Sequence, residues 1–375
     1  MIFDAPPPPV PAVVASPQLP KVCEDTRPDV HFGGPDLPDG ALREELKARI
    51  EATPPGGEID WATYYFRDRD LADSLIAAQR RGVRVRVVLE ARPKQQSANR
   101  TVIAKLRAGL GDGLKLHGGG LSPFKLGKHL HLKVYAFSGP CPAVFVGSYN
   151  PAGDDPEDPR ILATVGDQDR GHNLLVELKS PEVVEALRDH VNDLWAGKVS
   201  RRSVRQNQPI TAGDTTIFLF PRIDPNVFEE AITDLGPGDR IIGAVSHMTP
   251  GTAAAGMEKA ALRGADVQLM VNGSRSRVSK KAVKPLRRSG AEVERYFGEK
   301  GVPMHAKFVI VEQAGKKSAW FGSFNFNRGS QWMNQEVLIR SEDPTVVDAL
   351  ESRFGEISRQ SARTQIAMRR RGDAR

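Results

Sequence analysis

An internal repeat constrains the fold of this 375-residue chain more than any other feature. Residues 55–90, which begin PGGEIDWATYYFRD, align without a gap with residues 237–272, which begin PGDRIIGAVSHMTP. In each copy a Pro-Gly turn precedes an apolar strand. A helix follows, then a glycine and a second strand rich in valine or leucine. This pattern predicts one βαβ unit with parallel strands in each copy.

The chain repeats itself again further on. Residues 179–195, KSPEVVEALRDHVNDLW, resemble residues 341–357, SEDPTVVDALESRFGEI. Both segments are typical of amphipathic helices, and each has a proline near its first turn. The chain is therefore expected to be α/β and to form two similar halves.

Composition predicts the boundaries of these halves. Residues 1–30 are rich in proline and are expected to form a disordered arm. The first half is expected over residues 31–196 and the second over residues 215–360. Residues 197–214 have no apolar period, which predicts a linker. Residues 361–375 are expected to form a basic tail.

The bulk composition leaves location open. No run of about 18 apolar residues occurs, so no transmembrane segment is expected. The N-terminus lacks a basic region and prolines interrupt its apolar run, which is a poor match to a signal peptide. We expect a soluble monomer that is cytoplasmic, or secreted if a leader is missing. The net charge of +7 permits an anionic substrate without identifying one.

The two cysteines, Cys23 and Cys141, are too few for a four-cysteine zinc site. A single disulfide is possible, but free buried thiols are the favoured interpretation. The cysteines therefore do not indicate the cellular compartment of the protein.

A second pair of matching motifs carries the chemistry. In HLHLKVYAFS, His131 and Lys133 lie two residues apart, and GSYN follows at residues 147–150. In the second half His305 and Lys307 have the same spacing, and GSFN follows at residues 322–325. Residues i and i+2 of a strand point to the same face, so each histidine is expected beside its lysine. The glycine is expected to let the backbone approach a ligand closely.

Two such motifs facing each other suit a phosphodiester. One imidazole can attack phosphorus while the other protonates the leaving alkoxide. Lysines and asparagines can hold the remaining phosphate oxygens. No cofactor is required, and no cluster of metal ligands is found in the sequence. The candidate catalytic residues are His131, Lys133, Asn150, His305, Lys307 and Asn325, with Ser148 and Ser323 in support.

This double motif resembles the phospholipase D superfamily, over roughly residues 40–358. The resemblance implies two α/β/α sandwich halves with mixed, largely parallel sheets, related by a pseudo-twofold axis. It also implies one active site at their interface, a phosphohistidine intermediate, and attack by water or an alcohol. A single chain with two motifs fits the branch that includes cardiolipin-synthase-like enzymes.

The sequence departs from the family pattern at one position in each half. The family places an aspartate five residues after the lysine, where this chain has Ser138 and Glu312. Some DNA-repair phosphodiesterases of the superfamily also lack this aspartate. The departure therefore leans slightly towards a nucleic-acid substrate.

The family also places a carboxylate about eleven residues after the motif asparagine, where it orients the histidine. Glu336 has this spacing from Asn325. Aligning the helices that follow places Asn173 opposite Glu336, with Glu177 as the second choice. We expect Glu336 beside His305, which would suit a general acid. We expect Asn173 beside His131, which would suit a nucleophile.

The remaining histidines are expected to play lesser parts. His129 is expected to be a half-buried neighbour of the site, and His247 to be structural or to line the pocket. We expect His117 in a loop and His172 on the rim of the site. The basic stretch at residues 273–290 is expected to be a solvated face, or else a rim that attracts phosphates.

Three functions remain open. The leading one is a phosphodiesterase or phosphatidyltransferase that acts on phospholipids and contacts membranes peripherally. The alternative is a nuclease or DNA-processing phosphodiesterase. The third is a catalytically degenerate binding module, against which the intact histidine, lysine and asparagine of both motifs argue.

Overall fold

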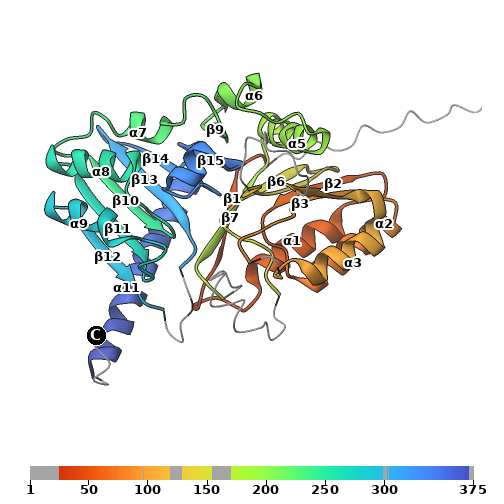
Figure 1. Ribbon diagram of the computed structural model, residues 1–375, viewed down its shortest axis with the longest axis horizontal. Coiled ribbons are helices and arrows are strands. Elements are labelled where there is room, and N and C mark those ends of the chain that lie inside the picture. The colour runs from red at the N-terminus through yellow and green to blue at the C-terminus, as the bar shows by residue number, and fades with distance from the viewer. Residues whose placement is uncertain are drawn as a thin grey trace, which may run out of the picture.

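A computed structural model describes residues 25–95, 97–118, 129–153, 170–298, 302 and 304–370. It contains two mixed β-sheets, one in each half, with helices on their faces (Figure 1). The predicted βαβ repeat and the two similar α/β halves are therefore confirmed. Residues 1–24, which make up most of the predicted arm, lie outside the described residues.

The first half contains a seven-stranded sheet. Its strands are β1 (Asp29–Gly33), β2 (Glu58–Thr63), β3 (Arg84–Glu90), β4 (Leu114–His117), β5 (Lys133–Phe137), β6 (Ala143–Gly147) and β7 (Asn173–Leu178). Their order is β1-β7-β6-β5-β2-β3-β4. The expectation that His117 lies in a loop is wrong, because this residue ends β4 and pairs with Glu90 of β3.

The second half contains an eight-stranded sheet. Its strands are β8 (Ile210–Ala212), β9 (Thr215–Phe220), β10 (Arg240–Val245), β11 (Asp266–Asn272), β12 (Glu292–Tyr296), β13 (Lys307–Gln313), β14 (Lys316–Gly322) and β15 (Glu336–Ser341). Their order is β12-β11-β10-β13-β14-β15-β9-β8.

Parallel pairing is confined to three adjacent strands in each half. These are β2-β3-β4 and β10-β11-β12, where helical crossovers connect the strands. The other neighbouring strands of both sheets, as far as the structure describes them, are antiparallel. The expectation of mixed sheets is confirmed, but "largely parallel" is wrong. The reason is that the strands carrying the motifs follow one another without a crossover helix.

Helices cover the outer face of each sheet. On the first sheet these are α1 (Ala41–Ala52), α2 (Arg69–Arg80) and α3 (Arg100–Leu110), followed by a 3-10 turn, η1 (Gly111–Gly113). On the second sheet they are α7 (Val227–Ala231), α8 (Thr252–Leu262) and α9 (Lys280–Arg288). A short helix, α10 (Arg328–Trp332), lies between β14 and β15.

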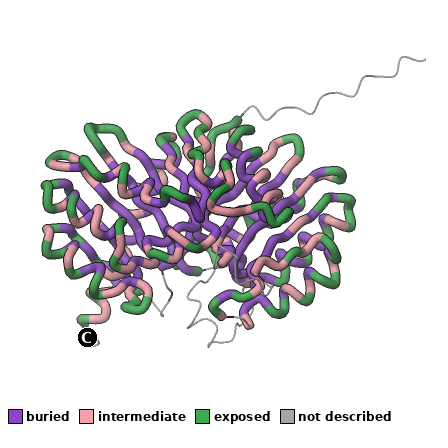
Figure 2. Tube along the Cα trace, turned by 45° about the horizontal axis from the view of Figure 1, so that its top comes forward, coloured by how far each residue is buried: buried purple, intermediate pink, exposed green. Residues whose placement is uncertain are grey.

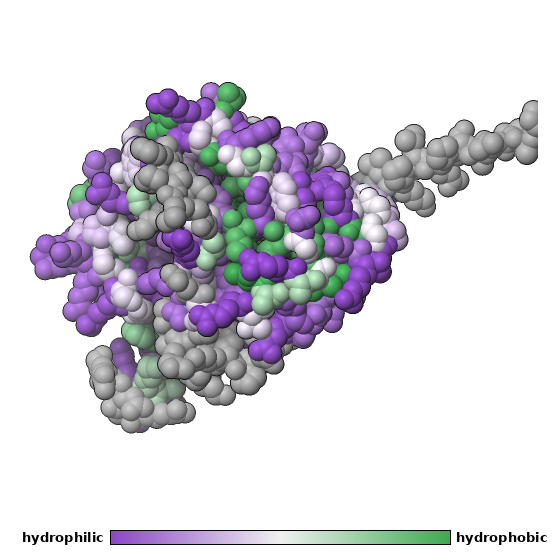
Figure 3. All heavy atoms as spheres, turned by 45° about the vertical axis from the view of Figure 1, so that its right-hand side comes forward, coloured by the Kyte–Doolittle hydropathy of each residue, from purple (hydrophilic) through white to green (hydrophobic). Residues whose placement is uncertain are grey.

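The two halves share one hydrophobic core. The inner faces of both sheets contribute to a single cluster, together with α5 (Pro181–Ala196) and α11 (Pro344–Arg370). Buried residues accordingly run along the strands and through the middle of the molecule, while exposed ones lie on outer helices and loops (Figure 2). On the face drawn in Figure 3, hydrophilic residues predominate and the hydrophobic ones gather near the middle. The shared core holds the halves at a fixed distance from each other.

A buried polar network also joins the halves. Arg353 of α11 donates to the backbone oxygen of Gly33 (3.1 Å) and pairs with Asp36 at 2.6 Å. His172 bonds Arg353 through Nδ1 (3.0 Å) and the hydroxyl of Tyr296 through Nε2 (2.9 Å). The expectation that His172 lies on the rim is therefore wrong. It is 1% exposed and connects one half to the other.

Several predicted segments contain more structure than expected. Strand β1 begins at Asp29, inside the predicted arm, and α11 continues to Arg370, through most of the predicted tail. The predicted linker contains α6 (Val204–Asn207) and β8. Cys141 is disulfide-bonded, so the expectation of free thiols is wrong for this residue, whereas Cys23 lies outside the described residues. Within the described part of the chain, no helix combines the length and apolarity needed to cross a membrane.

The buried residue His190 of α5 makes the free energy of unfolding depend on pH. It is 1% exposed, and burial lowers its pKa from 6.5 to about 4. The unfolded chain takes up the proton first, so the folded state loses stability as the pH falls below about 6.5. The loss from this residue is about 1.4 kcal/mol per pH unit. We therefore expect the free energy of unfolding in urea to fall less steeply between pH 6.5 and pH 4 in His190→Leu, by about 1.4 kcal/mol per pH unit. Equal slopes in the two proteins would contradict this prediction.

Candidate active site

Each motif histidine precedes a strand of its own half but pairs with the chain of the other half. The backbone N–H of His131 donates to the carbonyl oxygen of Gln335 at 2.9 Å. The N–H of His305 donates to the carbonyl oxygen of His172, also at 2.9 Å. Gln335 and His172 directly precede β15 and β7. The two halves therefore exchange contacts reciprocally, as a pseudo-twofold axis requires.

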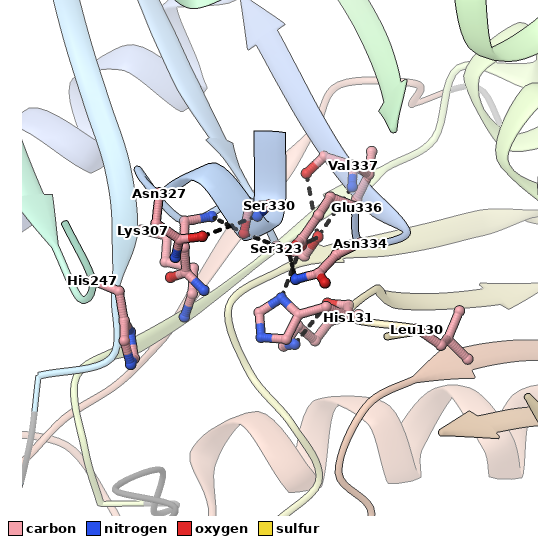
Figure 4. Close-up of polar contacts among 12 residues, drawn as sticks. Leu130, His131, His247, Lys307, Ser323, Asn327, Ser330, Asn334, Glu336 and Val337 are labelled. Carbon is pink, nitrogen blue, oxygen red and sulfur yellow. Dashed lines mark hydrogen bonds and ion pairs between the residues drawn. The ribbon is translucent and has the colours of Figure 1, made fainter. Parts of the chain in front are cut away.

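The orienting side chains follow the same exchange. Nδ1 of His131 lies 2.8 Å from Oε2 of Glu336, which begins β15 (Figure 4). Nδ1 of His305 lies 3.1 Å from Oδ1 of Asn173, which begins β7. The predicted pairings, Glu336 with His305 and Asn173 with His131, are therefore wrong, and the roles inferred from those pairings lose that support. Sequence alignment assigns each orienter to its own repeat, but the strand that carries it contacts the histidine of the opposite repeat.

The second-choice orienter is also excluded by its position. Glu177 pairs with Arg49 and lies 3.4 Å from Nε2 of His31, both in its own half. Neither partner belongs to a motif. Of these two candidates, Asn173 is the one that contacts a motif histidine.

The motif serines hold the orienters in place. The hydroxyl of Ser323 donates to Oε2 of Glu336 at 2.6 Å, and that of Ser148 donates to Oδ1 of Asn173 at 3.2 Å. Each hydroxyl also accepts a backbone N–H, from Val337 at 3.0 Å and from Leu174 at 3.1 Å. Both serines thus act through another residue, in their predicted supporting role.

Glu336 has two further donors that the sequence pattern did not indicate. The hydroxyl of Ser330 donates to Oε1 at 2.6 Å, and Nδ2 of Asn334 donates to the same oxygen at 3.2 Å. Both residues lie between GSFN and Glu336, near α10, and are labelled in Figure 4. A buried carboxylate with this many donors is fixed in orientation.

The motif glycines lie where a neighbouring strand comes close. A Cβ atom at Gly147 would lie 2.1 Å from the carbonyl oxygen of Leu174. At Gly322, where φ is +141°, it would lie 2.3 Å from the carbonyl oxygen of Val337. The glycine therefore allows the neighbouring strand to approach closely, and its expected role in the approach of a ligand stays a prediction. That close approach brings the orienter within reach of the motif serine.

The motif lysines are buried beside their histidines. Lys133 is 0% exposed and donates to the carbonyl oxygen of His131 at 2.8 Å. Lys307 is 3% exposed and donates to that of His305 at 2.9 Å. Nζ of Lys307 also lies 3.0 Å from Nε2 of His305. The strand alternation predicted from the sequence therefore places each lysine correctly.

The motif asparagines are fixed by backbone contacts. Oδ1 of Asn150 accepts the N–H of Tyr65 at 3.2 Å. The N–H of Asn325 donates to the hydroxyl of Ser330 at 3.2 Å. Oδ1 of Asn325 is buried without a hydrogen-bond partner among the described residues.

The electrostatics leave the first histidine neutral and its carboxylate charged. Burial lowers the pKa of His131 to about 4, although the charge of Glu336 acts in the opposite direction. Burial alone would raise the pKa of Glu336, but the hydrogen bonds from His131 and Ser323 and the charge of Lys133 hold it below its ordinary value. An ionised carboxylate only accepts, so Nδ1 of His131 carries the proton. Nε2 then presents its lone pair on the opposite side of the ring.

The second histidine is also neutral. Burial lowers the pKa of His305 well below 6.5, and the charges of Lys307, His247 and Lys133 lower it further. Because Lys133 belongs to the other half, the two motifs are close enough to influence each other electrostatically. At Nδ1 of His305 the structure places the amide oxygen of Asn173, where His131 has a carboxylate. The two histidines thus differ in charge environment.

The departures from the family pattern lie outside the site. Ser138 follows the last residue of β5, five residues after Lys133, and a strand of this length spans about 16 Å. Its hydroxyl accepts the N–H of Glu58 at 2.7 Å. Glu312 lies equally far along β13, opposite Arg240 of β10. At this distance from the motif lysines, neither residue is placed to contact a phosphate held by the motifs.

Two aromatic neighbours distinguish the halves. The ring of Tyr64 lies 5.0 Å from that of His131 and 5.7 Å from that of His129. The ring of His247 lies 6.1 Å from that of His305, and its Nδ1 lies 2.7 Å from the hydroxyl of Ser246. His247 therefore lies beside His305. This position agrees with a residue that lines the pocket, which is one of the two roles predicted for it.

Two positioning residues were missed by sequence reasoning. A carboxylate oxygen of Glu90 accepts the N–H of Leu130 at 2.6 Å. Nδ2 of Asn272 donates to the carbonyl oxygen of Met304 at 2.6 Å. Leu130 and Met304 each precede a motif histidine. Glu90 and Asn272 align in the repeat, as the last residues of the two aligned segments, and this correspondence was the available signal.

No group of three or more His, Cys, Asp or Glu side chains that could hold a metal ion occurs among the described residues.

Comparisons with known proteins match this architecture. The model of a family described as "Cardiolipin synthase, PLD-like domain" matches residues 47–195 and 237–358. No curated protein matches the sequence. The structure is similar to phosphatidylserine synthase from Haemophilus influenzae Rd KW20, with a TM-score of 0.63 and 14% identity over 88% of this chain and 86% of that one.

It is also similar to polyphosphate kinase from Porphyromonas gingivalis, with a TM-score of 0.57 and 15% identity. That match covers 87% of this chain and 50% of the kinase, so this chain spans half the length of that protein. At such identities, the likeness to both structures shows a shared fold.

Replacing Gly147 tests the close approach of the strands. We expect Gly147→Ala to destabilise the protein by about 1–3 kcal/mol, because the new Cβ displaces the backbone at Leu174. Turnover should fall as well, since Asn173 precedes Leu174. Gly236→Ala is the control, because a Cβ there would meet nothing closer than 3.9 Å. Equal unfolding midpoints for the two variants in urea would contradict the prediction.

Proposed function

Because this chain belongs to the cardiolipin synthase-like, PLD-domain family, we propose that it cleaves or exchanges the phosphodiester of a phospholipid through a phosphohistidine. The family and fold make it a phosphoryl-transfer enzyme. The observation that supports this mechanism most strongly is the 2.8 Å contact between His131 and Glu336.

In the proposed first step His131 is the nucleophile. Its Nε2 attacks phosphorus, and the bond from phosphorus to the leaving alcohol oxygen breaks. The imidazole becomes positively charged as it bonds to phosphorus. Glu336 stabilises that charge through Nδ1–H, as a buried carboxylate stabilises an imidazolium in other enzymes.

His305 is the proposed general acid and base. Its pKa is low in the free protein, but the negative charge of a bound phosphodiester favours its protonated form. It gives a proton to the leaving alkoxide in the first step. In the second step it takes a proton from water or an acceptor alcohol, whose oxygen attacks phosphorus. The bond between phosphorus and Nε2 of His131 then breaks, which restores both histidines.

The lysines and asparagines of both motifs are the proposed phosphate-binding groups. Lys133, Lys307, Asn150 and Asn325 would donate to the oxygens on which negative charge develops. Burial strengthens these interactions, because the local dielectric is low.

A phospholipid is the favoured substrate for two reasons. The family model carries the description of a lipid synthase, and the phosphatidylserine synthase fold spans most of both chains. A nuclease is the second candidate, supported by the basic stretch at residues 273–290. A binding module without catalysis is disfavoured, because the catalytic groups of both motifs are positioned by hydrogen bonds.

A substrate panel tests this proposal. We expect turnover of phosphatidylcholine or phosphatidylglycerol in the presence of a chelator, and a loss of that turnover in His131→Ala. Cleavage of single-stranded DNA without lipid turnover would replace the phospholipid with a nucleic acid. Inactivity on all three substrates would contradict the proposal.

Neutralising the orienter tests the role of the first histidine. We expect Glu336→Gln to slow phosphoenzyme formation by about 10²-fold or more, because the amide cannot stabilise the imidazolium by charge. Glu342→Gln is the matched control, since this exposed acid lies just beyond the far end of β15. Quenched-flow kinetics with labelled substrate measure the step. Rates within threefold of each other for the two variants would remove Glu336 from the mechanism.

A further inference from the structure

One surface of the second half carries an unusual concentration of cations. It consists of α9 and the loop before it, and we call it the α9 basic surface. Its exposed cationic residues are Arg275, Lys280, Lys281, Lys284, Arg287 and Arg288. The proposed mechanism uses none of them.

These charges are not neutralised by salt bridges in the part of the chain that the structure describes. Helix α9 contains no aspartate or glutamate, and none of the six cations forms a salt bridge within the described ranges of the chain. The apolar side of the helix is buried through Ala282, Val283 and Leu286. The guanidinium of Arg287 donates to the carbonyl oxygen of Val293 at 2.9 Å, and the other cations of α9 lie on one exposed side of the helix.

The arrangement is unfavourable for the helix by itself. Lys280 and Lys281 lie in the first turn, where the helix dipole disfavours positive charge. Lys284 lies four residues from both Lys280 and Arg288, a spacing at which like charges repel. An anionic partner would relieve both effects.

The first half provides an internal comparison. Helix α3 follows β3 as α9 follows β11, and it carries the cations Arg100, Lys105 and Arg107. Lys105 forms an ion pair with Asp73 at 2.5 Å. The charge on α3 is thus smaller and partly neutralised. The α9 basic surface belongs to the second half alone.

The α9 basic surface borders the active site. The N–H of Met248, next to His247, donates to the carbonyl oxygen of Arg277 at 3.1 Å. Burial is the largest cause of the low pKa of His305. The charge of Lys307 lowers this pKa further, and so does the charge of Arg277 in the loop before α9. The loop from residue 273 to residue 279 therefore lies beside the strand end that carries His247, and it leads to the start of α9.

An exposed aromatic side chain lies at the edge of this surface. Phe297 is 43% exposed, and its ring lies against Gly273, where an added Cβ would meet it at 3.1 Å. A phenylalanine beside a row of cations is typical of proteins that lie on a lipid surface, where the ring enters the headgroup layer.

We propose that the α9 basic surface docks on an anionic phospholipid bilayer and so presents the active site to lipid headgroups. The inference rests on the proposed phospholipid function. Clusters of four to eight lysines and arginines bind anionic leaflets in this way. A bilayer is favoured over a nucleic acid because the cations occupy a single outward side of one helix and adjoin an exposed apolar ring.

Vesicle co-sedimentation tests the docking. We expect the full chain to bind vesicles of phosphatidylcholine mixed with phosphatidylglycerol, to ignore pure phosphatidylcholine, and to dissociate as salt rises. The triple variant Lys280→Glu, Lys281→Glu, Lys284→Glu should bind at least about 100-fold more weakly. The control Arg100→Glu, Lys105→Glu, Arg107→Glu changes the net charge equally and should bind within threefold of wild type. Equal losses in the two variants would overturn the proposal, as would wild-type binding by the α9 variant.

Two further measurements separate this inference from the proposed function. A short-chain, monomeric phospholipid should be turned over equally by wild type and the α9 variant, whereas vesicle lipid should be turned over only by wild type. His131→Ala should still bind vesicles. Vesicle binding without any lipid turnover would uphold docking and overturn the catalytic proposal.

DNA binding tests the alternative partner. If the protein bound DNA more tightly than anionic vesicles, and the α9 variant lost this DNA binding, docking on lipid would be overturned. Thermal unfolding of each variant checks that it is folded.

Discussion

The hydrogen bond between His131 and Glu336 connects the two halves, and the active site that we propose depends on it. The first repeat supplies the histidine, and the second supplies the carboxylate that fixes its tautomer. Asn173 and His305 make the reciprocal contact. Neither half therefore contains a complete site. This dependence explains why so much of the molecule serves to hold the halves together, through a common core and the Arg353 network.

The same exchange gives the symmetric fold an asymmetric site. Two histidines in equivalent positions have different partners, one a charged carboxylate and the other a neutral amide. Both are largely buried, and in the mechanism that we propose the carboxylate beside His131 stabilises the cation that forms when this histidine bonds to phosphorus. A duplicated fold can in this way supply a nucleophile and a separate acid without changing either motif. The α9 basic surface adds a second difference, since its counterpart on α3 carries fewer and partly paired charges.

Much of this could be predicted from the sequence, because repeats and strand periodicity are local patterns. The βαβ units, the lysines beside their histidines and the serines in support follow from alignment and alternation. The partner of Glu336 could not be predicted, since the contact depends on how the halves face each other. The contact of Gly147 with Leu174 could not be predicted for a similar reason, because Leu174 lies on another strand. Ser138 was given too much weight until the length of β5 separated it from the site.

The central claim is that His131, oriented by Glu336, forms the covalent bond to phosphorus. The most direct measurement is to quench a single turnover with labelled phospholipid and to map the labelled peptide by mass spectrometry. Our account predicts phosphatidyl modification on His131, and the same site of modification at lower yield in Glu336→Gln. Label on His305 in the wild-type protein would contradict it, because the histidine with the amide partner would then be the nucleophile.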